Sequence, residues 1–195
     1  MSSPQHPFHR LLTFFARQNR TSTSNATNTI TFIDSLRGDL SLGFNFPLSV
    51  LLSLARHLYF RNTPSLLSLK ISIPDVKLDR KLLGGPEAYP SIRSDKAYSL
   101  SELQAIVKND TRGGGIKDRL DALSIWTMAA RRKDGLVSGS DLRAFQDGTV
   151  LESIAKRRKT GRDDVLPFWR GGPISVSGHS WAVKRFFDVD VYRKD

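Results

Sequence analysis

The sequence contains no cysteine, and only four of its 195 residues are histidine. The missing cysteine excludes disulfides, thiolate nucleophiles and cysteine-bound zinc or iron–sulfur sites. Histidine occurs at positions 6, 9, 57 and 179, so a site that depends on imidazole has few possible members. Acidic residues are scarce as well, since none precedes Asp34 and the chain carries a formal net charge of +11. This charge favours anionic partners, either acidic lipid headgroups or nucleic acid.

Residues 1–22 form a basic segment without acidic side chains. Within it, PFHRLLTFFARQ (7–18) is expected to be an amphipathic helix, and Arg10, Arg17 and Arg20 supply the charge. No apolar stretch of the kind found in secretory signals follows the first basic residue. The composition is typical of a mitochondrial presequence, and equally of a helix that lies on a membrane surface. The sequence favours neither interpretation over the other.

Long hydrophobic runs are also scarce, and the most apolar part of the chain is FNFPLSVLLSLARHLYF, residues 44–60. This segment is shorter than the roughly 20 residues that cross a hydrocarbon core. Pro47 interrupts it, and Arg56 and His57 are poorly tolerated within a spanning helix. The sequence therefore predicts either a membrane-interface segment, as a monotopic hairpin or an interfacial helix, or a buried core helix. In the interfacial case the candidate lipid-contacting residues are Phe44, Phe46, Leu48, Val50, Leu51, Leu52, Leu54, Leu58 and Phe60.

The rest of the chain predicts a mainly α-helical fold. A short strand is expected at 29–32 and a helix at 33–43. Scattered proline and glycine predict irregular structure over 61–98. We take residues 23–160 as the main domain and 161–195 as a C-terminal extension.

Three further helices are expected in the second half of the main domain. Ser99 and Glu102 have the spacing of a capping box at the start of one, and Thr149 and Glu152 have the same spacing at the start of another. Between them, residues 116–131 carry apolar side chains at helical spacing.

Two segments have the pattern of a calcium-binding EF-hand loop, in which oxygen ligands occupy alternate positions around a central glycine. In residues 130–141, Asp134 and Asp141 keep ligand positions, but Ala130 and Arg132 stand at two others. Because alanine offers no oxygen and a guanidinium repels a dication, calcium binding there is not expected.

The upstream loop, residues 23–34, keeps Asn25, Thr27 and Asp34 at ligand positions but holds a single carboxylate. Calcium affinity in such loops rises with ligand charge, so a tight site is not expected here either. Ile30 and Val137 stand where paired EF-hand loops exchange backbone hydrogen bonds. The sequence thus predicts degenerate, paired EF-hand-like helix–loop–helix units, joined by a short two-strand link, that kept the scaffold and lost the metal ligands.

Two stretches of the chain together resemble the caleosin family, the plant-type peroxygenases. The run DSLRGDLSLGFNFPLSVLLSLARHLYF (34–60) resembles that family's join between its calcium-binding loop and its apolar segment. The run DGLVSGSDLRAFQDGTVLE (134–152) resembles its C-terminal pseudo-loop. The resemblance implies a mostly helical, calcium-binding protein on lipid droplets or membrane surfaces. It also implies a histidine-ligated haem that uses a hydroperoxide, such as a fatty acid hydroperoxide, to oxygenate unsaturated fatty acids.

The chain departs from the family at the haem ligands. Leu11 stands at the position that best matches the family's first haem histidine, and Leu78 lies near the position of the second. His9 and His57 are the histidines that remain as candidate ligands. The resemblance therefore implies a peroxygenase whose activity is weakened or lost, because an axial ligand tunes the reactivity of haem iron.

A basic cluster follows on or after the last of these helices, and its candidate anionic-lipid-binding residues are Lys156, Arg157, Arg158 and Lys159. Basic side chains near a membrane surface bind acidic headgroups, and similar clusters bind nucleic acid. We predict a divergent caleosin-like protein of lipid droplets or the cytoplasmic face of membranes. One alternative is a non-catalytic lipid-surface interaction protein on the same scaffold. Another is a soluble, basic nucleic-acid-binding protein in which residues 44–60 form the core.

Overall fold

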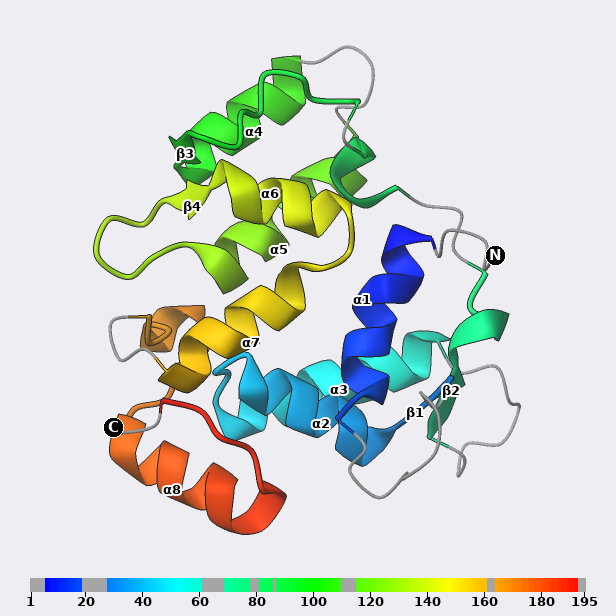
Figure 1. Ribbon diagram of the computed structural model, residues 1–195, viewed down its shortest axis with the longest axis vertical. Helices are drawn as coiled ribbons and strands as arrows, with labels where there is room; N and C mark the ends of the chain where they lie inside the picture. The colour runs from blue at the N-terminus through cyan, green and yellow to red at the C-terminus, as the bar shows by residue number, and fades with distance from the viewer. Residues whose placement is uncertain are drawn as a thin grey trace.

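The computed structural model describes residues 6–18, 28–60, 69–77, 81–85, 87–109, 115–160 and 164–192. Within these ranges the fold is mainly helical, as predicted (Figure 1). The helices are α1 (Pro7–Ala16), α2 (Phe32–Ser41), α3 (Phe46–Phe60), α4 (Leu100–Asn109), α5 (Ile116–Ala129), α6 (Gly139–Gln146), α7 (Val150–Thr160) and α8 (Val176–Phe187). The strands are β1 (Thr29–Thr31), β2 (Lys70–Ser72), β3 (Ala97–Tyr98) and β4 (Val137–Ser138), and the 3₁₀ turns are η1 (Ile73–Asp75), η2 (Leu82–Gly84) and η3 (Phe168–Arg170).

Figure 1 shows α4, α5 and α6 with β3 and β4 at one end of the long axis. Helices α2, α3 and α8 lie toward the other end, and α1 and α7 lie between the two groups. A large hydrophobic core contains residues of α1, α4, α5, α6 and α7. Leu48, Leu52 and Phe60 of α3 pack against it, so the core joins the two groups. A smaller cluster lies between α2 and the C-terminal residues.

Side-chain caps define several helix starts. The predicted capping box of α4 is present: the Ser99 amide donates to the Glu102 carboxylate over 2.8 Å, and the Glu102 amide donates to the Ser99 hydroxyl over 3.2 Å. The box predicted before α7 is wrong. The Thr149 hydroxyl instead donates to the carbonyl of Ala144, at the end of the preceding helix, and Glu152 pairs with Arg17 of the first helix region.

The predicted pairing of the two loops is wrong. Ile30 pairs with Ile71 in an antiparallel β1–β2 sheet, and Val137 pairs with Tyr98 in a separate β3–β4 sheet. Both partner strands lie within the span 61–98 that was predicted to be irregular. Each central apolar residue is buried within its own sheet, so its backbone groups are satisfied without the other loop.

Helix α1 turns its apolar side chains into the main core. Phe14 and Phe15 are both only 5% exposed, and Phe15 lies directly over Gly38 of α2. A Cβ on Gly38 would lie 2.3 Å from a ring carbon of Phe15, so the close approach of the two helices requires glycine there. The first helix thus contributes to the core of the fold.

The C-terminal residues pack back on the rest of the domain. The Tyr192 hydroxyl donates to the Gly43 carbonyl over 3.1 Å and accepts from Arg158 over 3.1 Å. The Arg37 guanidinium donates to the Phe187 carbonyl over 3.1 Å. These contacts tie the segment 164–192 to α2 and α7.

Candidate functional site

Helix α3 faces the domain with its polar side. Ser49, Ser53 and His57 follow one another at intervals of four residues, so they share one face of the helix. All three are completely buried. In most helices at the surface of a domain, the buried side is apolar and the polar side faces water. The orientation of α3 is therefore inverted.

The polar side of α3 is buried because α2 offers it matching groups, which together we call the α2–α3 seam. Asp39 of α2 is 1% exposed and lies at its centre. Its carboxylate accepts from the Ser53 hydroxyl over 2.9 Å and from both terminal nitrogens of Arg56 over 3.1 and 2.8 Å. Next to this pair, Ser35 Oγ lies 2.9 Å from His57 Nε2. The seam consists of Ser35, Asp39, Ser53, Arg56 and His57.

Burial shifts the protonation of two seam residues. It raises the pKa of Asp39 above its ordinary value, although Arg56 and Ser53 act in the opposite direction. Burial and the nearby Arg56 charge lower the pKa of His57 to about 4. The imidazole is therefore neutral at physiological pH, which suits a ring whose Nε2 shares a hydrogen bond with a serine hydroxyl.

The opposite side of α3 presents large apolar residues to solvent. Leu51 is 61% exposed and Tyr59 75% exposed, and the others are between 39% and 49% exposed. Scattered single leucines at a surface are ordinary, but a contiguous set on one helix face indicates a binding surface. We call this set the outer α3 face, and it consists of Leu51, Leu54, Leu58 and Tyr59. Phe46 is exposed as well, but it lies on the Ser49 side of the helix, where its ring contacts Phe187 of α8.

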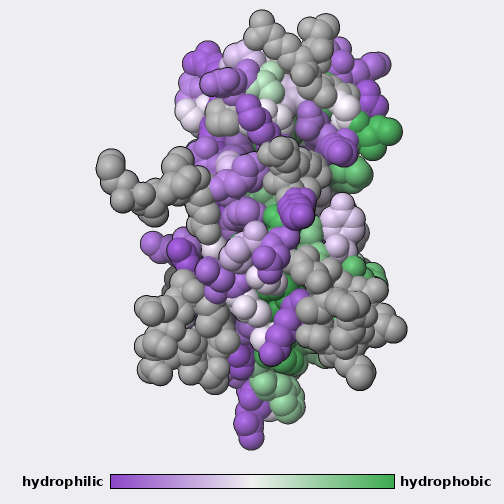
Figure 2. Space-filling model, turned by 90° about the vertical axis from the view of Figure 1, so that its right-hand side faces the viewer, coloured by the Kyte–Doolittle hydropathy of each residue, from purple (hydrophilic) through white to green (hydrophobic). Residues whose placement is uncertain are grey.

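One face of the molecule carries hydrophobic and hydrophilic residues in separate areas. Figure 2 shows hydrophobic residues gathered along the right-hand edge of the view, while hydrophilic residues cover the left and much of the centre. Among the residues that the structure describes, no helix combines the length and apolar character needed to cross a bilayer.

An apolar cleft of about 520 Å³ lies beneath α3. Leu48 and Leu52 of α3 form one wall, Phe8 of α1 and Met128 of α5 form others, and the lining is mostly hydrocarbon. The cations on its lining are Arg56 and Arg170. Volumes of this size are typical of small-molecule sites.

Arg170 is an unusual cation at the wall of this cleft. It is 5% exposed, and its Nη2 donates to the Ala130 carbonyl over 2.5 Å. Within the described residues, its Nε is buried without a hydrogen-bond partner. Burial, with the charge of Arg158 nearby, lowers its pKa to about 10. An anionic group that entered the cleft would find an incompletely satisfied guanidinium there.

The structure sorts the predicted lipid-contacting residues into three groups. Phe46, Leu51, Leu54 and Leu58 are exposed, as an interfacial segment requires. The prediction is wrong for Phe44, which is 5% exposed because it precedes α3 and packs in the main core. The remaining four are partly buried: Leu48, Leu52 and Phe60 line the cleft, and Val50 packs against the smaller cluster.

The predicted basic cluster is only partly available at the surface. Arg158 is completely buried, donating to the Tyr192 hydroxyl and to the Met128 carbonyl, so the prediction that it binds lipid is wrong. Arg157 lies 2.8 Å from an oxygen of Asp141 and 3.4 Å from one of Asp164. Lys156 and Lys159 are exposed. Helical spacing explains the difference, because α7 turns position 158 toward the core and positions 156 and 159 outward.

The remnants of the calcium loops are engaged by other protein groups. Asp34 accepts from the amide and the hydroxyl of Thr31 over 2.9 and 2.6 Å. Asp134 pairs with Arg131 over 2.6 Å, and Asp141 pairs with Arg157. Each carboxylate of the second loop is therefore paired with an arginine of its own, in the place where a calcium ion would supply the positive charge.

Asn25 and Thr27 lie outside the described residues. Elsewhere in the part of the chain that the structure describes, no group of three or more histidine or acidic side chains is placed to hold a metal ion.

The histidines proposed as haem ligands do not fit that role. His9 Nε2 lies 3.0 Å from the Val76 carbonyl, and His57 is enclosed in the α2–α3 seam. Neither ring lines the apolar cleft or the two hollows near the C-terminus. An axial ligand needs a nitrogen that faces space for the porphyrin. We therefore derive no reaction step from haem.

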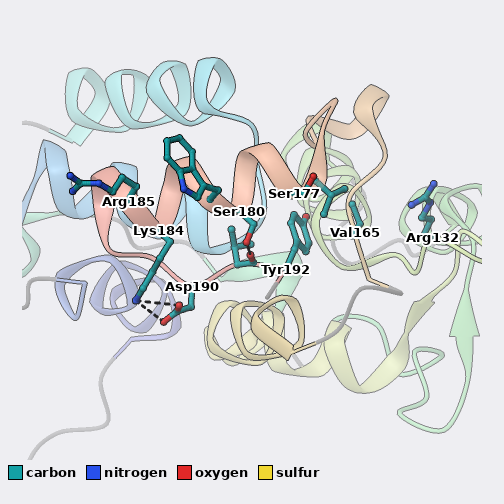
Figure 3. A pocket seen from close by; sticks show the side chains of 11 residues that line it. Arg132, Val165, Ser177, Ser180, Lys184, Arg185, Asp190 and Tyr192 are labelled. Atoms are coloured by element: carbon teal, nitrogen blue, oxygen red, sulfur yellow. Dashed lines mark hydrogen bonds and ion pairs between the residues drawn. The ribbon is translucent and has the colours of Figure 1, made fainter. Parts of the chain in front are cut away.

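A second hollow, of about 890 Å³, lies beside α8 (Figure 3). Several of its polar groups bind neighbouring protein groups. Lys184 contacts Asp190, as the dashed lines show, and also Asp188. The Ser180 hydroxyl donates to the Val191 carbonyl over 2.6 Å. These contacts hold residues 188–191 against α8, and the outer α3 face with its cleft remains the better candidate site.

Sequence reasoning missed several exposed apolar residues. Tyr59 lies inside the predicted segment and is the most exposed member of the outer α3 face, but it is not among the predicted lipid-contacting residues. Phe168, Trp169 and Ile174 of the C-terminal extension are 63%, 71% and 88% exposed. The clustering of aromatic residues in that extension was the available signal.

Comparison with protein-family models, with curated proteins and with solved structures finds no match.

Proposed function

We propose that this protein docks on a lipid surface, as a divergent caleosin-like protein of lipid droplets or membranes. The single observation that supports the proposal is the inverted α3. Ser49, Ser53 and His57 are completely buried while Leu51, Leu54 and Leu58 face outward. Exposed leucines are unfavourable in water unless another apolar phase covers them.

The energetics favour a lipid surface as that phase. Burying a large apolar side chain contributes about 1.5–3 kcal/mol. The four residues of the outer α3 face are roughly half exposed, so together they contribute on the order of 5 kcal/mol. The formal net charge of +11 adds attraction to acidic headgroups. Stable peripheral anchoring generally needs two such contributions, one apolar and one electrostatic.

The apolar cleft favours a second, related role. A fatty acid would place its chain along Leu48, Leu52 and Met128 and its carboxylate near Arg170, where the unpartnered Nε lies. This role keeps the fatty acid that the family resemblance implies, without oxygenation. Displacement of a fluorescent fatty acid, lost in a cleft-filling Leu52→Trp variant, tests it.

Vesicle flotation tests the proposed docking. The protein is mixed with vesicles of phosphatidylcholine and phosphatidylserine, and the bound fraction is compared for the wild type and for the double variant Leu51→Ser/Leu58→Ser. These leucines are 61% and 49% exposed, so removing both should weaken partitioning by about 30-fold or more. Ile116→Ser is the matched control, because Ile116 is 79% exposed on α5, outside the outer α3 face.

The outcomes separate lipid from other partners. Loss of flotation in the double variant with retention in the control supports the proposal. A dimer that the double variant converts to a monomer would show instead that a second copy covers the face. Binding to nucleic acid, with no flotation of the wild type, would favour the basic nucleic-acid-binding alternative.

A further inference from the structure

The C-terminal extension exposes three large apolar residues within one short stretch. Phe168 and Trp169 lie in η3, and Ile174 lies just before the start of α8. They are 63%, 71% and 88% exposed, so Ile174 is more exposed than any member of the outer α3 face. We call these three residues the C-terminal anchor.

The exposed Trp169 ring is held in place by its neighbours. It stacks on Trp126 of α5 with the ring centres 5.8 Å apart and the planes inclined by 36°. The Arg170 guanidinium lies 5.3 Å from the Trp126 ring and 5.6 Å from the Trp169 ring. Trp126 is itself fixed, because its indole nitrogen donates to the Gly135 carbonyl over 2.8 Å. Little rotamer freedom would therefore be lost when the outer face of Trp169 binds something.

The anchor is joined directly to the start of α3. The amide and side-chain nitrogens of Asn45 donate to the carbonyls of Gly171 and Gly172 over 2.7 and 3.1 Å. The Asn45 side-chain oxygen also accepts from the Leu48 amide over 3.0 Å, which caps α3. Asn45 thus connects the turn that carries Trp169 to α3, the helix that carries the outer α3 face.

Gly171 allows this contact to be close. Its φ of +88° lies in the left-handed region, and a Cβ there would be 2.2 Å from a methyl carbon of Leu48. Glycine meets both conditions, since it lacks a side chain and adopts positive φ without strain. The turn consequently packs against the first turns of α3.

A cation stands beside the anchor. Arg132 lines a hollow of about 480 Å³ together with Phe168 and Ile174, and its side chain is exposed. Aromatic residues with a cation next to them are suited to the headgroup level of a membrane, where tryptophan is enriched and basic groups contact lipid phosphate. The charge and the apolar residues therefore match one occupant, an anionic lipid surface.

We propose that the C-terminal anchor is a second lipid contact of the same docking surface. Phe168 and Ile174 enter the acyl region, Trp169 lies at headgroup level, and Arg132 binds a lipid phosphate. This inference rests on the proposed docking through α3 and adds a role for the extension, which nothing in the sequence motifs assigned.

Tryptophan quenching by brominated lipid tests the inference in the 195-residue chain. Vesicles of brominated phosphatidylcholine and phosphatidylserine should quench the wild type, and Trp169→Phe should remove most of the quenching. Trp181→Phe is the matched control, because Trp181 is 66% exposed on α8 but is not joined to α3 in this way, so quenching should persist. Ile174→Ser should weaken flotation by about tenfold or more.

The outcomes distinguish this inference from the function on which it rests. Flotation that depends on Leu51 and Leu58, together with quenching that depends on Trp169, supports both. The same flotation with full quenching in Trp169→Phe overturns the second contact alone. Failure of the wild type to float overturns both. Circular dichroism and urea unfolding of each variant verify that the fold is intact.

Discussion

Replacing His57 by glutamine should remove a large part of the acid sensitivity of this protein. His57 is completely buried in the α2–α3 seam, and its pKa is lowered to about 4, mainly by burial and then by the charge of Arg56. In the unfolded chain the same imidazole takes up a proton near its ordinary value of 6.5. Glutamine can still hydrogen-bond to Ser35 but does not titrate.

The sign follows from which state binds the proton more readily. The unfolded chain binds it first as the pH falls, so the stability that neutral His57 contributes is present above pH 6.5 and is lost toward pH 4. A lowering from 6.5 to about 4 corresponds to about 3 kcal/mol in full, of which about 2 kcal/mol is lost by pH 5. For a domain of ordinary stability this is a substantial fraction.

Urea unfolding at pH 7, 6 and 5 measures the effect. The wild type should lose about 2 kcal/mol more than His57→Gln between pH 7 and pH 5. His179→Gln provides a comparison at a second buried histidine. Burial also lowers the pKa of His179, but that ring lies in α8, so the variant leaves the seam unchanged. Equal losses in the wild type and in His57→Gln would refute the burial argument, and with it the claim that the seam holds α3 in its inverted orientation.

Two further predictions concern charges whose partners the structure identifies. Asp39→Ala leaves Arg56 without its buried carboxylate and should lower the free energy of unfolding by about 2–4 kcal/mol, whereas Asp95→Ala removes an exposed ion pair and should leave the urea midpoint unchanged. Calcium at about 1 mM should not change Trp126 fluorescence, because arginines already neutralise both aspartates of the loop 130–141 whose Gly135 carbonyl contacts that indole. A saturable calcium-dependent change would show that those arginines are displaced.

Much of the secondary structure could be predicted from local sequence. The helices near 33–43, 44–60 and 99–109 appear where apolar periodicity and the Ser99–Glu102 cap placed them, because helix formation and capping depend on residues within a few positions of one another. The strand at Ile30 was also found. Its partner was not, since strand pairing joins residues far apart in sequence and the short run at 70–72 carries little signal of its own.

For the candidate site, the sequence identified the segment and four of its exposed apolar residues, but left its orientation open. A helix with leucines on one side and serines on the other fits either way round until its neighbour is known. The neighbour is α2, whose buried Asp39 and Ser35 form hydrogen bonds with Ser53, Arg56 and His57. Unpaired burial of those groups would be costly, so this complementarity lets the polar side face inward and leaves the leucines in solvent.

The same distinction applies to the whole chain. The sequence by itself determined the mainly helical class, the positive charge and the absence of cysteine chemistry, because these follow from composition and short-range pattern. Only the tertiary structure decided that α3 is inverted, that Arg158 is buried and that the C-terminal extension packs beside α3. Those features depend on which side chains meet across the fold, and contacts between distant residues are what local periodicity does not encode.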